Sequence, residues 1–318
     1  MEDKGIPRIM TVTLSPALDK SCSVAQVVAE RKLRCGPPAY YPGGGGINVA
    51  RAITALGGDV AAYWPCGGKN GELLKRLLDE EGVTNHPITI QAMTRENLTV
   101  CERSGEQQFR FGMPGARLTD GETRSLLQSL RVSDSRPDYL VLSGSLPPEV
   151  DEGLYAEIAE SMPTSCRVIL DTSGRSLRRG LGSRVFLIKP NMRELEQLSG
   201  QSIEDDRQIR DVARSLIDEG KSQVVVTSLG SGGAVLTTAD WHEPIRSPTV
   251  KIRSKIGAGD SMVAGIVFAL AAGKSIPDAV RYGVAAGAAA VTTEGTELCR
   301  RQDTEQLYRE MTASAASE

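Results

Sequence analysis

Short runs of β-branched residues and leucine alternate with longer helical stretches along most of the chain. Five runs are typical of strands buried on both faces of a sheet, at residues 9–14, 138–142, 167–170, 185–188 and 223–227. Six stretches are candidates for helices, at residues 47–56, 71–81, 152–161, 205–219, 258–272 and 276–291. Because strands and helices alternate, the sequence predicts an α/β fold with a mostly parallel central sheet wrapped by helices.

Two stretches interrupt this alternation. One covers residues 20–41, and the other covers residues 97–103 and 107–111, joined by Ser104-Gly105-Glu106. The second stretch predicts a β-hairpin, because turn residues separate two runs typical of strands. If both stretches pair outside the main sheet, they form a small β-sheet lid, and a second copy of the chain could cover its open edge.

The composition fits one large domain and excludes several classes of function. The 318 residues contain no recurring block and no low-complexity tract, so we expect one continuous domain over residues 1–318. The 37 Lys and Arg residues against 40 Asp and Glu give a net charge of −3, which provides no chain-wide basic field for nucleic acid or an anionic membrane. Only two histidines are present, so His-rich metal sites and most His-dependent triads lack their side chains.

The same features predict a cytoplasmic protein. Residues 1–8 are polar and lack the apolar core of a secretory signal. The most apolar stretch, residues 262–273, is about 12 residues long, whereas a bilayer span needs about 20. The six cysteines include no C-x-x-C pair, which fits reduced thiols.

Two glycine clusters precede apolar helices. Gly43, Gly44, Gly45 and Gly46 have no Cβ, so a ligand can touch the backbone there, although the run also fits a mobile loop. A dinucleotide-binding fingerprint is excluded, because its spacing requires glycine where Asn48 stands.

The second cluster, Gly257-Ala258-Gly259-Asp260, opens the stretch at residues 258–272. Its amides can form an anion hole for developing phosphate charge. Asp260 is then either a base that acts beside this hole or an ordinary acidic residue at a helix start.

Polar residues also follow two predicted strands. Lys189, Asn191 and Glu194 come directly after residues 185–188, at the sheet edge where open α/β sheets bind ligands. The i, i+3 spacing of Asn191 and Glu194 suits hydrated Mg²⁺ beside phosphates, but it also fits a proline-started helix with a surface glutamate. The glycine turn at residues 228–233 follows the strand at 223–227 and could equally be a hairpin connection.

Four motifs occur together in order, at residues 13–19, 43–48, 189–194 and 257–260. They resemble the PfkB, or ribokinase-like, family of carbohydrate kinases, and the resemblance extends over residues 11–298. It implies a three-layer ribokinase-like α/β fold with a small β-lid, and a homodimer whose lid strands pair. The major domain is expected at about 1–17, 42–94 and 115–318, and the lid at about 18–41 and 95–114.

The resemblance also implies roles for single residues. Asp260 would be the general base, Gly257, Ala258 and Gly259 the anion hole, and Lys32 a contact to the transferring phosphate. The sugar phosphate would be held by Asp19, Gly43, Gly44, Gly45, Asn48, Arg95, Ser145 and, from a neighbouring subunit, Arg34. ATP would be bound by Lys189, Asn191, Ser228, Gly230, Gly232 and Gly233, and Mg²⁺ by Glu194, through water.

Family members often hold K⁺ beside the anion hole. The matching positions here are Ser254, Ile256, Ala290, Thr293 and Gly295. The closest relatives have Asn and Arg where this chain has Thr293 and Glu297, so a K⁺ requirement stays open.

Within the family, residues 32–35, 43–52, 113–115, 143–148 and 283–287 most resemble the 6-phosphofructokinase branch. The expected reaction is ATP-dependent phosphorylation of the C1 hydroxyl of fructose 6-phosphate. Sugar-phosphate kinases that act on fructose 1-phosphate or tagatose 6-phosphate usually carry Lys at the position of Gly45, and they stay the first alternative. A non-catalytic sugar or nucleotide sensor on the same fold is the second.

Overall fold

The structure is a computed structural model and describes residues 8–105, 107–132, 136–182, 184–293 and 295–315. Its central sheet has nine strands in these described ranges. Their order across the sheet is β13 (His242–Ile245), β12 (Ala234–Thr237), β11 (Val224–Ser228), β10 (Val185–Ile188), β9 (Arg167–Asp171), β8 (Tyr139–Ser143), β1 (Ile9–Val12), β4 (Val60–Cys66) and β5 (Thr84–Thr89). All neighbours from β11 to β5 are parallel, and only β12 and β13 are antiparallel.

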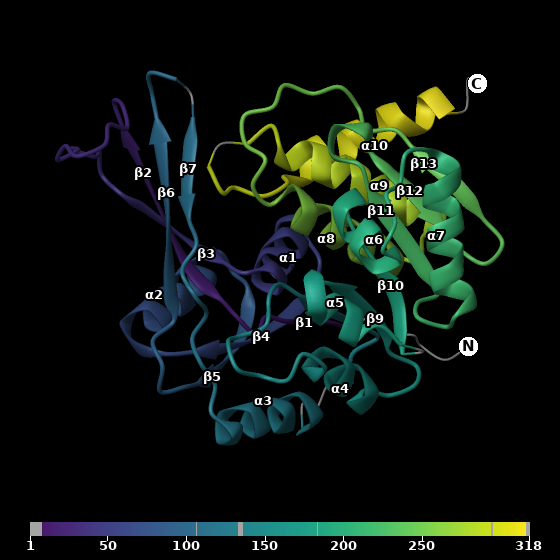
Figure 1. Cartoon of the computed structure of the whole chain (residues 1–318), viewed down its shortest axis with the longest axis horizontal. Coiled ribbons are helices and arrows are strands. Elements are labelled where there is room, and N and C mark those ends of the chain that lie inside the picture. Colours follow the sequence, from purple (N-terminus) through teal and green to yellow (C-terminus); the bar gives the residue numbers. More distant parts are fainter. Residues whose placement is uncertain (1–7, 106, 133–135, 183, 294, 316–318) are drawn as a thin grey trace.

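Helices cover both faces of this sheet (Figure 1). One face is covered by α1 (Gly45–Ala55), α2 (Gly68–Glu80), α8 (Ala258–Ala271), α9 (Ile276–Ala290) and α10 (Arg301–Ala315). The other is covered by α3 (Asp120–Val132), α4 (Leu154–Ser161), α5 (Gly174–Gly180), α6 (Met192–Ser199) and α7 (Asp206–Asp218). The predicted mostly parallel α/β architecture in three layers is confirmed.

The strands form two cores because successive side chains point to opposite faces. In β8, Tyr139 and Val141 pack into the core under α8 and α9, whereas Leu140 and Leu142 pack into the core under α3 and α4. Both faces of the strand are therefore apolar, which accounts for its continuous hydrophobic run.

The second sheet stands at one end of the molecule, away from α7 and α10 (Figure 1). It has the order β3 (Ala39–Gly43), β2 (Ala17–Val24), β6 (Arg95–Glu102) and β7 (Gln108–Phe111). β6 and β7 form the predicted hairpin, although Glu106 of its turn lies outside the described residues. β2 pairs antiparallel with β3 and parallel with β6, so the two interrupting stretches meet side by side as predicted.

The hydrophobic pattern missed several elements and gave no membrane span. The missed elements are β4, β5, β12, β13, α3, α5, α6 and α10. In the part of the chain that the structure describes, no helix is long and apolar enough to cross a membrane.

Candidate active site

The catalytic carboxylate predicted from the sequence stands in the first turn of α8. The helix begins after Gly257, whose φ of 73° is left-handed, and a Cβ at this position would lie 2.4 Å from Cδ2 of Leu298. Glycine is therefore required at this helix start for conformational and steric reasons. Asp260 follows three residues later, beside the free amides of the first turn.

Asp260 is held by a side chain from a distant part of the sequence. Nδ2 of Asn48, on α1, donates a hydrogen bond of 2.8 Å to its Oδ2. Burial and the nearby Asp171 raise the pKa of Asp260 to about 6, against the opposing effects of Asn48 and Lys189. A carboxylate with this pKa is ionised at neutral pH yet basic enough to accept a proton, as a general base must.

Lys189 places a positive charge beside this carboxylate. Its side chain is 8% exposed, and its Nζ lies 3.3 Å from Oδ1 of Asp171, at the end of β9. A Cβ built on Gly259 would be 3.6 Å from the same Nζ, so the ammonium group faces the start of α8. Burial alone would lower the pKa of Lys189, but the charges of Asp171, Glu194 and Asp260 raise it, which keeps the ammonium form for binding phosphate.

The glycine run Gly43–Gly46 passes very close to its neighbours. A Cβ at Gly43 would lie 2.2 Å from Oδ2 of Asp19, and one at Gly45 would lie 2.4 Å from Oγ of Ser143. Gly44 has a φ of 114°. A Cβ at Gly46 would lie 2.6 Å from Oγ1 of Thr13. The structure thus explains why all four positions lack side chains, and the run spans the end of β3 and the start of α1.

Asp19 stands on β2, where the small sheet joins the major domain. Its Oδ1 accepts a hydrogen bond of 2.8 Å from Nδ2 of Asn97 on β6. Burial raises its pKa, although Asn97, Arg110, Arg95 and Arg51 act in the opposite direction. Its Oδ2 faces the glycine run, so this carboxylate and that run are brought together as predicted.

Arg95 and Ser145, both predicted to bind a phosphate, occupy different settings. Arg95 donates to the carbonyl oxygens of Ser15 and Met113, at 2.9 Å each, and burial lowers its pKa. Its Nε also donates to the carbonyl oxygen of Pro16 at 3.4 Å, so all three nitrogens are engaged and one N–H of each terminal nitrogen is left for a ligand. Ser145 is exposed just after β8.

A cavity of about 430 Å³ opens beside the start of α8. Ser228, Gly230 and Gly233 line it together with Ala258 and Gly259, which are predicted anion-hole residues. Its wall also includes apolar side chains that the sequence analysis did not identify, namely Val250, Ile252, Met262, Val284 and Val291. A polar glycine turn at one side and an apolar wall suit a nucleotide with its base on the wall and its phosphates toward Asp260.

The glycine turn at residues 228–233 is both a hairpin connection and part of the cavity wall, so the two interpretations of its sequence do not exclude each other. It connects the antiparallel strands β11 and β12, and four of its residues, Ser228, Gly230, Ser231 and Gly233, also line the cavity. Gly232 is the one predicted nucleotide contact of the turn that is absent from the described cavity lining.

Asn191 and Glu194 form a reciprocal cap at the start of α6. The backbone N–H of Asn191 donates to Oε2 of Glu194, and the N–H of Glu194 donates to Oδ1 of Asn191, both at 2.9 Å. Asn191 is also bridged to Ser228 at the end of β11. Asn191 and Glu194 are therefore fixed beside the cavity. Their mutual capping hydrogen bonds explain the i, i+3 spacing of the two residues.

The chemistry of this region fits one Mg²⁺ held partly by the nucleotide. In the described residues, no group of three or more His, Cys, Asp and Glu could hold a metal ion alone. Mg²⁺ usually takes one or two carboxylates and completes its octahedron with water and phosphate oxygens. Burial raises the pKa of Glu194 and Asp171 adds to this effect, so a cation here would relieve the repulsion of the two carboxylates.

All five predicted K⁺ positions take part in hydrogen bonds, in one group of three residues and one pair. Oγ of Ser254 donates to the carbonyl oxygen of Gly295 at 2.7 Å, and the N–H of Ile256 donates to that Oγ at 3.2 Å. Oγ1 of Thr293 lies 2.8 Å from the carbonyl oxygen of Ala290. These residues lie in the chain segment that precedes α8 and at the end of α9 and just after it, and the Ser254–Gly295 contact joins the two parts.

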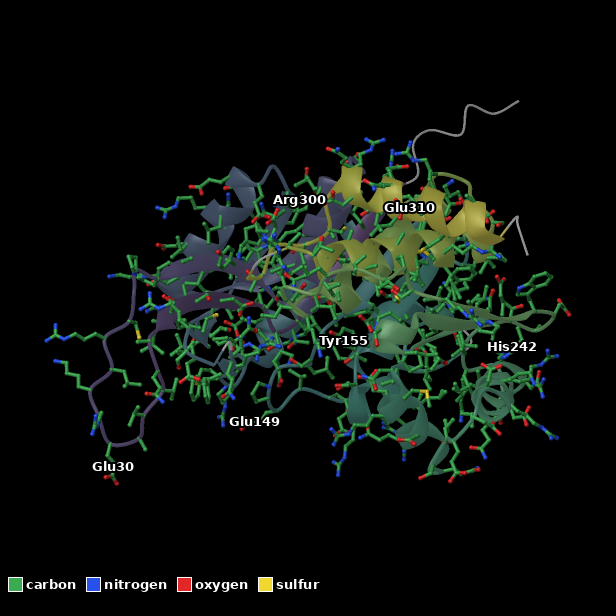
Figure 2. The ribbon with its side chains drawn as sticks, turned by 90° about the horizontal axis from the view of Figure 1, so that it is seen from above. Glu30, Glu149, Tyr155, His242, Arg300 and Glu310 are labelled. Carbon is green, nitrogen blue, oxygen red and sulfur yellow. The ribbon has the colours of Figure 1, made fainter. Side chains whose placement is uncertain are left out.

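Lys32 and Arg34 lie on the loop between β2 and β3, and both are exposed. Figure 2 shows Glu30 of this loop far out from the body of the molecule. None of the contacts described for the chain joins Lys32 or Arg34 to the surroundings of Asp260. The single subunit therefore leaves these two predicted residues apart from the rest of the site.

Asp171 is a site residue that the sequence analysis missed. It ends β9, one residue after the predicted strand at 167–170, and its carboxylate contacts Lys189 and influences Asp260. Its position at the carboxyl end of a parallel strand was the available signal.

A basic carboxylate at a helix start, a buried lysine and a nucleotide-sized cavity, on a three-layer α/β fold, are typical of small-molecule kinases. Residues 14–303 match the sequence profile of the pfkB family of carbohydrate kinases. The chain belongs to this family.

Curated relatives and solved structures agree with this assignment. The ATP-dependent 6-phosphofructokinase isozyme 2 of Mycobacterium tuberculosis is 44% identical, over 96% of this chain and 90% of that protein. The enzyme of the same name from Escherichia coli is 41% identical, over 95% of this chain and 98% of that protein. Crystal structures of phosphofructokinase-2 from Escherichia coli with potassium and with fructose-6-phosphate match at TM-scores of 0.92 and 0.91, with 40% and 39% identity over 96% of this chain and 99% of theirs.

Relatives with another substrate are less similar. The 1-phosphofructokinase of Borreliella burgdorferi is 32% identical over 94% of this chain and 96% of that protein.

Proposed function

We propose that this chain transfers the γ-phosphoryl group of ATP to the C1 hydroxyl of fructose 6-phosphate, giving fructose 1,6-bisphosphate. The observation that carries this proposal is the position of Asp260, raised in pKa, at the start of α8 and beside the nucleotide cavity. The substrate rests on the greater similarity to 6-phosphofructokinases than to 1-phosphofructokinases.

In the proposed mechanism Asp260 accepts the proton of the C1 hydroxyl as that oxygen attacks the γ-phosphorus in line with the leaving ADP oxygen. The amides at Gly257, Ala258 and Gly259 receive the developing negative charge, and the Lys189 ammonium group stands next to them. Because these groups are fixed before the substrate arrives, they need little reorganisation during the reaction.

The sugar phosphate binds between the two sheets. Asp19 and Asn48 hold the sugar hydroxyls beside the glycine run, and Arg95 and Ser145 bind the 6-phosphate. Lys32 approaches the transferring phosphate when the lid closes, and Arg34 reaches the sugar phosphate of a neighbouring subunit. This arrangement makes the active form a homodimer built through the small sheet.

ATP lies in the 430 Å³ cavity, with Ser228, Gly230 and Gly233 near its phosphates and Lys189 and Asn191 at their end. Glu194 holds Mg²⁺ through water, and the ion neutralises charge on the phosphate oxygens. The carbonyl groups around Ser254, Ile256, Ala290, Thr293 and Gly295 hold K⁺ next to the anion hole. We place the reaction in the cytoplasm, where ATP and sugar phosphates meet.

A steady-state assay of ADP release tests this function. We expect the kcat/KM with fructose 6-phosphate to exceed that with fructose 1-phosphate and with tagatose 6-phosphate by at least about tenfold. A preference for either of the other sugar phosphates would replace the proposed substrate but keep the reaction class. Binding of sugar and nucleotide without turnover of any of the three would instead favour a non-catalytic sensor.

Mg²⁺ and K⁺ are tested in the same assay. Chelation of divalent cations with EDTA should abolish turnover, and excess Mg²⁺ should restore it. Replacing K⁺ by tetramethylammonium should lower the rate, and an equal rate in the two salts would remove the proposed K⁺ site.

A further inference from the structure

An ion pair between a buried arginine and an exposed glutamate lies behind Asn48, on the side opposite Asp260. The side chain of Arg51 is 7% exposed, and its Nε and Nη2 contact the two carboxylate oxygens of Glu81 at 2.6 and 2.7 Å. Such a two-point contact fixes the plane of the guanidinium group. Arg51 stands on α1 and Glu81 directly follows α2, so the pair also joins two helices.

The remaining arm of the guanidinium group points to the active site. Nη1 of Arg51 donates to the carbonyl oxygen of Pro42 at 3.0 Å and to Oδ1 of Asn48 at 3.3 Å. Pro42 directly precedes the glycine run that faces Asp19. One side chain thus contacts both the backbone before the sugar-binding glycines and the amide that holds Asp260.

These contacts determine which way the Asn48 amide faces. An arginine can only donate hydrogen bonds, so the oxygen of the Asn48 amide must face Arg51. The amide nitrogen then faces Asp260 and donates to its Oδ2. Ionised Asp260 alone would still favour this orientation. Without Arg51, however, the amide could turn over when Asp260 is protonated and accept a hydrogen bond from its carboxyl group, which would stabilise the protonated form.

From this geometry we infer that Arg51, fixed by Glu81, is a positioning residue for the catalytic base and acts through Asn48. The inference rests on the proposed role of Asp260. The ionised groups that face Asp260 are Asp171 at the end of β9, Lys189 after β10 and Asp19 on β2, and of these Asp19 is itself influenced by the charge of Arg51. The charge of Arg51 must therefore be separated from its hydrogen bonds.

Three variants make this separation. Arg51→Met removes the charge and the hydrogen bonds, whereas Arg51→Lys keeps the charge and loses the two-point contact with Glu81. Glu81→Gln leaves Arg51 in place and weakens its fixation. Arg76→Met is the matched control, because it removes an exposed arginine of α2 that pairs only with Glu80, 3.6 Å away, among the described contacts.

The measurements are kcat, both KM values and the pH dependence of kcat/KM. For Arg51→Met we expect kcat at pH 7 to fall by about 10–100-fold, mainly because the base is no longer held in position. The acidic limb of the pH profile should move up by about one unit, because the Asn48 amide then favours the ionised form of Asp260 less over the protonated form. The KM for ATP should change less than about twofold. Arg51→Lys and Glu81→Gln should move the limb in the same direction but less, and Arg76→Met should leave it unchanged.

Circular dichroism and thermal unfolding show whether each variant is folded, and Glu81→Gln keeps the test available if Arg51→Met does not fold. A purely structural role predicts lower stability in the folded variants with an unmoved pH limb, and that result would overturn the inference. Asp260→Asn separates the two hypotheses. If this variant keeps near-normal turnover, the proposed base is wrong, whereas a large loss there with an unmoved limb in the Arg51 variants removes only the positioning role.

Discussion

The burial of Asp260 disfavours its ionised form and therefore opposes folding at neutral pH. Asp260 is an acid whose pKa in the folded protein, about 6, lies above its ordinary value of 3.8. Such a group binds protons more strongly in the folded state, so its contribution makes the fold less stable as the pH rises from about 4 through 6. The carboxylate is kept for chemistry and opposes stability at neutral pH.

We therefore predict that Asp260→Asn stabilises the protein while it inactivates the enzyme. At pH 8 the free energy of unfolding should rise by about 1–3 kcal/mol, because a shift of about two units corresponds to that order of energy. The gain should shrink as the pH falls from 6 toward 4, where the wild-type carboxylate takes up its proton. Urea unfolding at pH 8 and pH 4.5 measures both values.

The exposed Asp240, in the turn before β13, gives a matched control for this experiment. Asp240→Asn should show no comparable gain at pH 8. If Asp260→Asn is less stable than wild type at pH 8, the contacts of the Asp260 carboxylate stabilise the fold by more than its burial destabilises it.

The glycine run gives a second prediction for single residues. In Gly43→Ala the new Cβ would be 2.2 Å from Oδ2 of Asp19, so the carboxylate must turn away while the backbone can stay. We expect the KM for the sugar phosphate to rise by about tenfold or more and the KM for ATP to change little. Gly182→Ala is the control, since a Cβ there meets nothing within 4 Å. Equal changes in both KM values would contradict the assignment of Asp19 to the sugar.

Among the helices and strands, those with a clear hydrophobic pattern could be predicted from the sequence. The buried strands β8, β9, β10 and β11 are continuous apolar runs and were predicted within one residue at each end. The edge strand β5, Thr84–Thr89, alternates exposed and half-buried residues and includes proline, so its sequence resembles a loop. Its place in the sheet comes from pairing with β4, which no local pattern reveals.

The candidate site also contains some residues that sequence motifs reveal and others that only the folded structure brings together. The motifs at Gly43–Gly46 and at Gly257–Asp260 could be found because glycine marks close approaches of the backbone. The role of Arg51 could not be found in this way, because its partners Glu81 and Pro42 are distant in sequence or contact it through the backbone. The apolar wall of the cavity could not be found from the sequence either, because its residues look like ordinary core positions.

The helix pair that includes Asp260, the proposed base, depends on small side chains. Gly265 on α8 faces α9 so closely that a Cβ would lie 2.7 Å from Cβ of Ala286 and 2.9 Å from Cα of Gly283. Gly265→Ala should therefore separate the two helices and lower the free energy of unfolding by about 1–3 kcal/mol, although alanine favours helices. Thermal or urea unfolding measures this loss.

The same substitution in α3 provides the contrast. Gly121 is exposed, and a Cβ there would meet only Oγ1 of Thr119, at 3.9 Å. Gly121→Ala should leave stability unchanged or raise it by up to about 1 kcal/mol. If both Gly265→Ala and Gly121→Ala stabilise the protein, the contact between α8 and α9 does not require glycine at position 265.

The whole molecule has two sheets with different exposure. The central sheet is covered by helices on both faces, whereas the small sheet stands at one end of the molecule (Figure 1). The small sheet leaves apolar side chains exposed. Phe111 on the edge strand β7 is 49% exposed, and Met113, just after it, is 46% exposed. Apolar groups on an unpaired edge are an unfavourable surface for a monomer and suit pairing with a second copy.

We therefore predict that the chain is a dimer in solution and that the small sheet forms the contact. Phe111→Glu should shift the mass measured by light scattering from about 68 kDa toward 34.0 kDa, because a charge would be buried in the contact. Activity at low protein concentration should fall with it, since Arg34 is proposed to reach a neighbouring subunit. Trp241→Glu is the matched control: Trp241 is 53% exposed in the turn before β13, at the far end of the central sheet. Loss of the dimer in the Trp241 variant, with the Phe111 variant unaffected, would place the contact on the central sheet and leave Lys32 and Arg34 without their proposed route to the active site.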